Sequence, residues 1–192
     1  MRDVRERILR ATVEAATIHG LSRLSVGDVA KRAGLSRPTV YKHFPSRQDL
    51  IAAAVRSEAR QMVAAVRVEV ETEPDPRRAL EAGVLLALRL LRDHALLDRI
   101  VRSEPDTLVP LLTTDGGLIM SEIRVPVEEI VAAKVPGLDT ITVRRLADVL
   151  TRLLISYALN APDDPPEVVA ALVAALLVDG AAALPDVPTR VI

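Results

Sequence analysis

The chain has 192 residues, of which 49% are hydrophobic and only 2% aromatic, with 25 basic residues against 26 acidic ones and no cysteine. This length suits one large domain or a small domain joined to a larger one, with a core built from Ala, Val, Leu and Ile. The lack of cysteine excludes disulfides, thiolate metal sites and cysteine nucleophiles, and suits a reducing compartment.

The sequence shows no pattern for membrane insertion or metal binding. Its first residues are charged, unlike a signal peptide, and the longest uncharged run near the C-terminus covers 11 residues, Val168 to Val178. A bilayer span needs roughly 20. The three histidines lie far apart in the sequence, without the paired spacing of metal ligands. We therefore expect a soluble, cytoplasmic protein with no cofactor, no metal and no membrane contact.

The charges are distributed unevenly. Residues 1–50 carry ten Lys and Arg against five Asp and Glu, whereas residues 51–192 carry fifteen against twenty-one. A basic N-terminal quarter on an acidic body is typical of a domain that binds a polyanion. A solvated basic surface without a partner explains the same charges, so composition leaves both interpretations open.

Helical patterns follow one another from the N-terminus. Apolar residues at helical spacing predict a first helix that ends at Gly20. Ser25 is the expected N-cap of a second helix, with Asp28 three residues later, and Gly34 is the residue expected to end it.

Two more capping signals follow. Ser36 is the expected N-cap of a short third helix, "RPTVYKH", with Pro38 in its first turn, where a missing N–H costs nothing. Ser46, with Asp49 three residues later, predicts a fourth helix from 47 to about 71.

The rest of the chain is also predicted to be helical. Pro126 should bend or split the helix that contains it. No strand-like alternation and no internal repeat is found, so the expected fold class is all-α. The further helices are expected at about 76–92, 94–103, 105–112, 118–133, 143–159 and 167–184.

The second and third helices are each about eight residues long, and only Gly-Leu-Ser separates them. Two short helices across a tight glycine turn form the helix-turn-helix pattern, whose second helix enters the DNA major groove. Arg37, Lys42 and Arg47 supply positive charge here. Thr39 and Tyr41 supply hydroxyls for phosphates or base edges.

The pieces "SVGDVAKRAGLS", "TVYKHF" and "PSRQDL" lie in order within residues 5–51. This stretch resembles the DNA-binding domain of TetR-family transcriptional regulators. The resemblance implies an N-terminal three-helix helix-turn-helix DNA-binding domain over 1–46. A C-terminal helical domain for ligand binding and dimerisation would cover 47–192.

The resemblance also implies which residues contact double-stranded DNA. Two positions depart from the family pattern: Pro38 stands where Gly or Lys is usual, and Ala16 where an aromatic is common. For His43, a DNA contact and a plain surface position both stay open. With the capping Ser36, the expected DNA-binding residues are Ser25, Ser36, Arg37, Pro38, Thr39, Tyr41, Lys42, His43 and Arg47.

The C-terminal helices fit the family's effector-binding domain. The scarcity of aromatic residues favours an aliphatic small molecule over a planar one. Each candidate lining residue, taken by itself, is better explained as ordinary core. These candidates are Met62, Leu85, Leu88, Leu112, Met120 and Ile123.

Helices 143–159 and 167–184 are too apolar to cover only one small bundle. We expect them to pair with their symmetry mates in a homodimer. Two identical DNA-binding domains would then meet a palindromic operator, with recognition helices roughly 34 Å or a small multiple apart.

Motifs of catalysis are absent, including a nucleophile elbow, a phosphate-binding glycine loop and a histidine pair on a helix. We therefore interpret the protein as a DNA-binding regulator and not as an enzyme, with a ligand-responsive repressor as the leading hypothesis. The alternatives are an architectural DNA-binding protein without an effector, and a small-molecule carrier with a vestigial DNA-binding domain.

Overall fold

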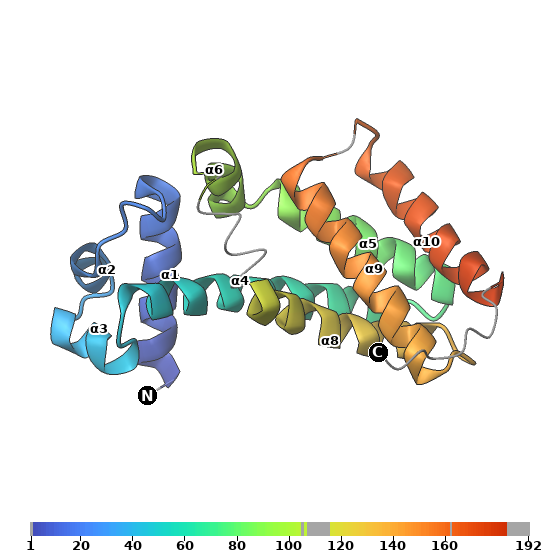
Figure 1. The fold of residues 1–192 in the computed structure, drawn as a ribbon, viewed down its shortest axis with the longest axis horizontal. Helices are drawn as coiled ribbons and strands as arrows, with labels where there is room; N and C mark the ends of the chain where they lie inside the picture. Colours follow the sequence, from blue (N-terminus) through green and yellow to red (C-terminus); the bar gives the residue numbers. More distant parts are fainter. Residues whose placement is uncertain (1, 105, 107–115, 162, 184–192) are drawn as a thin grey trace. The chain divides into compact units, whose positions relative to one another are not determined.

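The computed structural model describes residues 2–104, 106, 116–161 and 163–183, and within these ranges it contains helices and no β-strand (Figure 1). The all-α prediction is therefore confirmed, whereas the helix expected over 105–112 falls almost entirely outside the described residues. The helices are α1 (Arg2–His19), α2 (Val26–Arg32), α3 (Arg37–His43), α4 (Arg47–Thr72), α5 (Pro76–Arg92), α6 (Ala95–Ser103), α8 (Gly116–Lys134), α9 (Thr140–Leu159) and α10 (Pro166–Ala183).

The chain forms two compact units. The first unit, Met1–Met62 with Leu91–Ile123, contains α1, α2, α3, the first part of α4, and α6. The second unit, Val63–Leu90 with Arg124–Ile192, contains the rest of α4 with α5, α9, α10 and most of α8. We call α1, α2 and α3 the head. The division of function between 1–46 and 47–192 stays a prediction.

One continuous apolar core lies inside the first unit. Ile8 of α1, Val29 of α2 and Val40 of α3 are fully buried in it. Leu96 and Ile100 of α6 complete the same core. Burying a Leu or Ile side chain stabilises a fold by about 1.5–3 kcal/mol relative to leaving it exposed. The stability of the head therefore depends in part on α6, a helix from much later in the sequence.

In the second unit, α5 and α10 run antiparallel. Arg77 at the start of α5 pairs with Asp179 near the end of α10. Arg89 near the end of α5 pairs with Glu167 at the start of α10, with Nη2 2.7 Å from Oε1. Both pairs are largely exposed, so they contribute little stability, but together they define the direction of the two helices (Figure 1).

A glycine sets the distance between α4 and α5 in the second unit. A Cβ atom placed on Gly83 would lie 2.5 Å from Cγ2 of Val70. Val70 is buried, so its side chain has little room to move away. We infer that α4 and α5 pack this closely only because position 83 has no side chain.

The helix α8 continues through Pro126. Proline removes one backbone N–H and its ring crowds the carbonyl four residues earlier, which is why the sequence predicts a bend or a break here. A break does not occur, and that part of the prediction is wrong. Val127, Ile130 and Val131 are buried just after the proline, and burying this face favours one uninterrupted helix.

Candidate nucleic-acid interface

Both ends of α2 are held as the sequence predicts. The Ser25 Oγ accepts the Asp28 N–H at 3.0 Å and donates to Asp28 Oδ2 at 2.7 Å. At the other end, Gly34 has a φ of +64°, and the N–H of Leu35 donates to the Ala30 carbonyl at 2.8 Å. This left-handed glycine ends α2 and directs the chain into α3.

The helix α3 is capped and anchored in the same local way. The Ser36 Oγ accepts the Thr39 N–H at 3.3 Å, and the two hydroxyls share a hydrogen bond of 2.8 Å. Pro38 lies in the first turn, as predicted. Val40 and Phe44 point into the core and are buried. One side of α3 is therefore fixed, and the opposite side faces outward.

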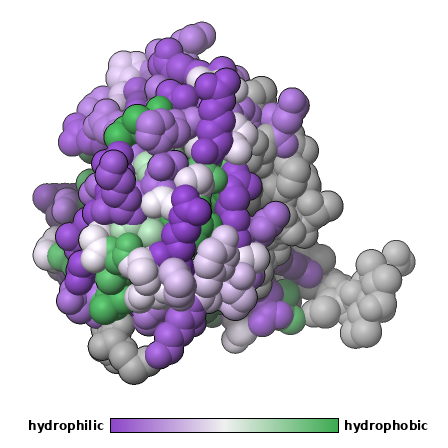
Figure 2. Space-filling view, turned by 90° about the vertical axis from the view of Figure 1, so that its left-hand side faces the viewer, coloured by the Kyte–Doolittle hydropathy of each residue, from purple (hydrophilic) through white to green (hydrophobic). Residues whose placement is uncertain are grey.

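The outward side of α3 carries cations and hydroxyls. Tyr41 is 48% exposed although it is aromatic. Thr39 and His43 are partly exposed. The side of the molecule seen in Figure 2 is mainly hydrophilic, with small apolar patches between polar groups. The exposed members of the predicted set on this helix are Arg37, Pro38, Tyr41 and Lys42.

Arg37 also lies across the first turn of α2. A Cβ atom on Gly27 would lie 2.3 Å from Arg37 Nη2 and 2.7 Å from Arg37 Nε. The guanidinium group therefore occupies space that a glycine leaves open. This contact links α3 to α2, and no local sequence pattern indicates it.

Arg47, at the start of α4, fastens the turn between α1 and α2. Its Nε donates to the Leu24 carbonyl at 2.7 Å, and its Nη2 donates to the Ser22 carbonyl at 2.8 Å and to the Leu21 carbonyl. The guanidinium thus has a structural task within the head. The DNA contact expected of Arg47 stays a prediction. Such a contact would use the guanidinium N–H groups that are not bonded to these carbonyls.

Glu104, directly after α6, holds the same turn from another side. One carboxylate oxygen accepts the Ser22 N–H and the other accepts the Ser22 hydroxyl, both at 3.0 Å. Gly20 has a φ of +86°, and a Cβ there would lie 1.7 Å from Glu104 Oε1. The sequence predicts Gly20 as a helix end, but nothing local reveals the carboxylate that it accommodates.

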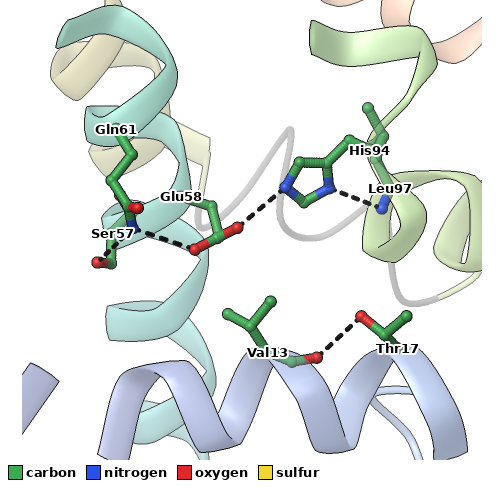
Figure 3. Close-up of polar contacts among 7 residues, drawn as sticks. All are labelled: Val13, Thr17, Ser57, Glu58, Gln61, His94 and Leu97. Atoms are coloured by element: carbon green, nitrogen blue, oxygen red, sulfur yellow. Dashed lines mark hydrogen bonds and ion pairs between the residues drawn. The ribbon is translucent and has the colours of Figure 1, made fainter. Parts of the chain in front are cut away.

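At its beginning, α6 is attached to α4 (Figure 3). The His94 Nδ1 accepts the Leu97 N–H at 3.2 Å, and His94 Nε2 lies 3.0 Å from Glu58 Oε2. Gln61 donates to the other oxygen of Glu58 at 3.2 Å. These contacts fit a ring with its proton on Nε2, which donates to the carboxylate. The two ends of α6 are therefore tied to α4 and to the α1–α2 turn.

The candidates for a ligand pocket divide between the units. Met62, Met120 and Ile123 belong to the first unit, and Leu85 and Leu88 to the second. Of these, only Leu88 is fully buried. The sixth candidate, Leu112, lies outside the described residues. The pocket stays a prediction.

The described ranges hold no metal-binding cluster and no membrane-spanning helix. No group of three or more His, Asp or Glu side chains there could hold a metal ion. No described helix combines the length and the apolar character that crossing a membrane requires.

Two family models match the chain. Bacterial regulatory proteins of the tetR family match residues 8–54, and the C-terminal domain of the bacterial tetracyclin repressor matches residues 75–179. The chain belongs to the TetR family. The resemblance seen in residues 5–51 is thereby confirmed, and the second match extends it over most of the remaining chain. TetR-family proteins are transcriptional regulators with a DNA-binding helix-turn-helix domain, which agrees with the surface of α3.

Individual relatives of this TetR-family chain are similar over part of their length. An uncharacterised HTH-type transcriptional regulator of Mycobacterium bovis is 34% identical over 102 residues, 53% of this chain and 52% of the relative. The HTH-type transcriptional activator FasR of Mycolicibacterium smegmatis is 32% identical over 80 residues, 42% of this chain and 36% of FasR. The chain thus spans no more than about half the length of these curated relatives.

A solved structure is similar over nearly the whole chain. The TetR-family repressor AlkX from Dietzia, implicated in biodegradation of n-alkanes, superimposes with a TM-score of 0.77 at 24% identity. The match covers 94% of this chain and 96% of AlkX. The shared fold therefore includes the C-terminal helices as well as the head.

Proposed function

We propose that this TetR-family chain is a ligand-responsive repressor that binds a palindromic DNA operator as a homodimer. The observation that carries the proposal is the outward face of α3, where Arg37, Tyr41 and Lys42 are exposed. The opposite face is buried through Val40 and Phe44. A short helix held in this way offers groups that bind phosphates and base edges in the major groove.

Footprinting with the purified protein on genomic fragments tests the proposal. A single protected inverted repeat is the expected result. Steep salt dependence without a preferred site would instead support an architectural DNA-binding protein. If the protein binds none of the fragments, the result would support the small-molecule carrier with a vestigial DNA-binding domain.

The roles of individual residues on α3 can be separated on the identified operator. We expect Tyr41→Ala to weaken binding to all sequences, because a phosphate contact carries no base information. Thr39→Ala should also relax the preference at one base position, by about 1–3 kcal/mol. Thr72→Ala, which removes an exposed hydroxyl at the end of α4, is the control and should leave binding unchanged.

An exposed apolar stripe on α10 supports a homodimer. Val169, Val173 and Leu177 face the interior of the second unit and are buried. Leu172 and Leu176, on the other side, are 57% and 64% exposed, and Val168 extends the same stripe. A monomer gains nothing from three large apolar side chains in water. A second copy of this helix, with α9 beside it, would cover them in the four-helix interface expected from residues 143–159 and 167–184.

Sedimentation analysis tests the dimer. Leu172→Arg places a charge in the proposed interface and should yield monomers with unchanged helicity. Val68→Arg alters a similarly exposed residue of α4, at 63%, and should leave the dimer intact. Equal sedimentation of all three proteins as dimers would place the interface elsewhere.

We also propose that the effector is aliphatic. Two per cent aromatic residues leave few rings to stack on a planar molecule, and AlkX is implicated in biodegradation of n-alkanes. An effector lowers DNA affinity only if it binds the non-binding conformation more tightly. Titration of the operator complex with medium-chain aliphatic compounds should release DNA. Release by planar aromatic compounds alone would refute the aliphatic assignment.

A further inference from the structure

Arg5 of α1 lies on the ring of Phe44. Its Cζ atom is 4.9 Å from the centre of the ring. Phe44 is the C-cap of α3 and is buried, whereas Arg5 is exposed. A cation at this distance over an aromatic face is attracted by the electrons of the ring. The contact therefore holds the guanidinium group of Arg5 at the C-terminal end of the recognition helix.

A cation–π contact acts through the charge of the guanidinium group and forms no hydrogen bond. All five N–H donors lie in the guanidinium plane and point outward from its edge. Within the described residues, Arg5 makes no hydrogen bond and no ion pair. Arg7, two residues later, is engaged, because its Nη2 donates to the Ala33 carbonyl at 2.7 Å. Arg5 is thus positioned by a contact that leaves its hydrogen-bonding capacity unused.

The surroundings of Arg5 on α1 favour an external anion. The acidic neighbours Asp3 and Glu6 are two and one positions away, which on a helix do not face it. The positions that do face it in the following turn hold Ile8 and Leu9, both buried and apolar. Across the helix boundary, the exposed Lys42 precedes Phe44 by two residues. Arg5 and Lys42 are both exposed cations near the end of α3, and together they add positive potential there.

We propose that Arg5 is a further DNA-binding residue, which presents its N–H edge to a backbone phosphate beside the groove that α3 enters. The proposal rests on the DNA-binding function proposed above and adds a contact from outside the helix-turn-helix motif. A phosphate is favoured over a base, because base edges are reached from the N-terminal part of a recognition helix. Arg5 lies at the opposite end of α3. A planar, preoriented guanidinium also matches phosphate geometry.

The salt dependence of DNA affinity distinguishes a phosphate contact from a purely structural role. Each phosphate contact contributes about 0.9 to the slope of log affinity against log salt. In a dimer, Arg5→Ala should therefore reduce the slope by about 2 and lower affinity at low salt by about tenfold or more, for operator and unrelated duplex alike. Arg5→Lys keeps the charge but loses the planar guanidinium group. Its salt slope and its affinity should lie between those of Arg5→Ala and the wild type.

Two further variants control the experiment. Arg10→Ala removes the same charge from another exposed position of α1 and should change the slope much less. Phe44→Leu keeps an apolar side chain in the core but removes the ring. When Arg5→Ala is added to Phe44→Leu, it should cost less affinity than it costs in the wild type, because the ring no longer holds the guanidinium group. Thermal unfolding of each variant checks that the head is folded.

The outcomes separate the two proposals. An unchanged slope in Arg5→Ala, or an equal loss in Arg10→Ala, overturns the role of Arg5 while the proposed function stands. If the wild type has no preferred operator, the proposed function fails, but the slope on unrelated duplex still supports or refutes the Arg5 contact. If the wild type binds no duplex DNA, both proposals are wrong.

Discussion

The carboxylate of Glu104 accepts both hydrogen bonds that the side chain and backbone N–H of Ser22 can donate, each at 3.0 Å. Arg47 binds the carbonyl of the same residue at 2.8 Å. The turn that connects α1 to α2 is therefore clamped by an anion that follows α6 and a cation from α4. The direction of α2, and of α3 after it, depends on these two side chains.

Glu104→Gln tests the clamp. A glutamine amide has one acceptor oxygen in place of two, so one of the bonds to Ser22 is lost. We expect the free energy of unfolding to fall by about 1 kcal/mol, which lowers the melting temperature by about 2–4 °C for a chain of this size. Glu71→Gln makes the same charge change at an exposed end of α4. Equal melting of the two variants would show that the clamp does not stabilise the fold.

Gly27→Ala should separate stability from DNA binding. The new methyl would overlap the end of the Arg37 side chain, which can move away. Alanine also favours a helix over glycine by up to about 1 kcal/mol. We expect unchanged or higher thermal stability together with altered operator affinity, because Arg37 is displaced. Affinity identical to that of the wild type would mean that the position of Arg37 over α2 is irrelevant to binding.

Asp139 should make the stability of α9 sensitive to acid. The Thr142 hydroxyl, together with the backbone N–H groups of Thr142 and Ile141, lowers the pKa of the Asp139 carboxyl below its usual value. The carboxylate therefore stabilises the folded state fully at pH values above the unfolded pKa of about 3.9. This stabilisation is lost as the pH falls through the lower folded pKa.

Asp139→Asn checks this expectation. Asparagine still caps a helix but does not titrate in this range. Denaturant unfolding at about pH 5 and about pH 2.5 should show a smaller loss of stability in the variant than in the wild type. Asp163→Asn, in the exposed loop before α10, should behave like the wild type. The same loss in all three proteins would contradict the assignment.

Thr151→Val should stabilise the second unit. Thr151 is fully buried, and its hydroxyl has no hydrogen-bond partner among the described residues. A buried hydroxyl without a partner costs about 1–3 kcal/mol, and valine has nearly the same shape. We expect the free energy of unfolding to rise by about 1 kcal/mol or more, as measured in guanidinium chloride.

Thr12→Val is the matched control. Thr12 is also buried, but its hydroxyl donates to the Ile8 carbonyl at 2.7 Å. This variant should be neutral or less stable than the wild type. If Thr151→Val lowers stability as well, then the Thr151 hydroxyl has a partner in solution.

Capping residues made the beginning of the chain predictable. Ser25, Ser36 and Ser46 each bond a group three residues later, and such local pairs are visible in the sequence. A capping residue also precedes α9, but the prediction that this helix starts at residue 143 did not take it into account. Asp139 accepts the N–H of Thr142 at 3.1 Å, so that α9 begins at Thr140. Local chemistry thus determines where these helices begin.

Long-range contacts were not predictable from the sequence. The resemblance assigns Arg47 a DNA contact, but its five donors can serve any nearby acceptors, and the path of the α1–α2 turn brings carbonyls to it. Arg5 and Phe44 share no periodic pattern, and neither do Ser22 and Glu104. In each pair the tertiary fold, and not a spacing, creates the contact.

The position of α6 in the core has a consequence for synthesis. Glu104 follows Ser22 by 82 residues, and a ribosome adds about 5–20 residues per second, so α6 is complete roughly 4 to 16 s after the α1–α2 turn. During that interval α1, α2 and α3 lack Leu96 and Ile100 of their core. We expect the nascent head to remain accessible to chaperones and proteases until α6 emerges. A message truncated before that point would then yield a fragment that contains all of α3 but lacks the part of the core that α6 supplies.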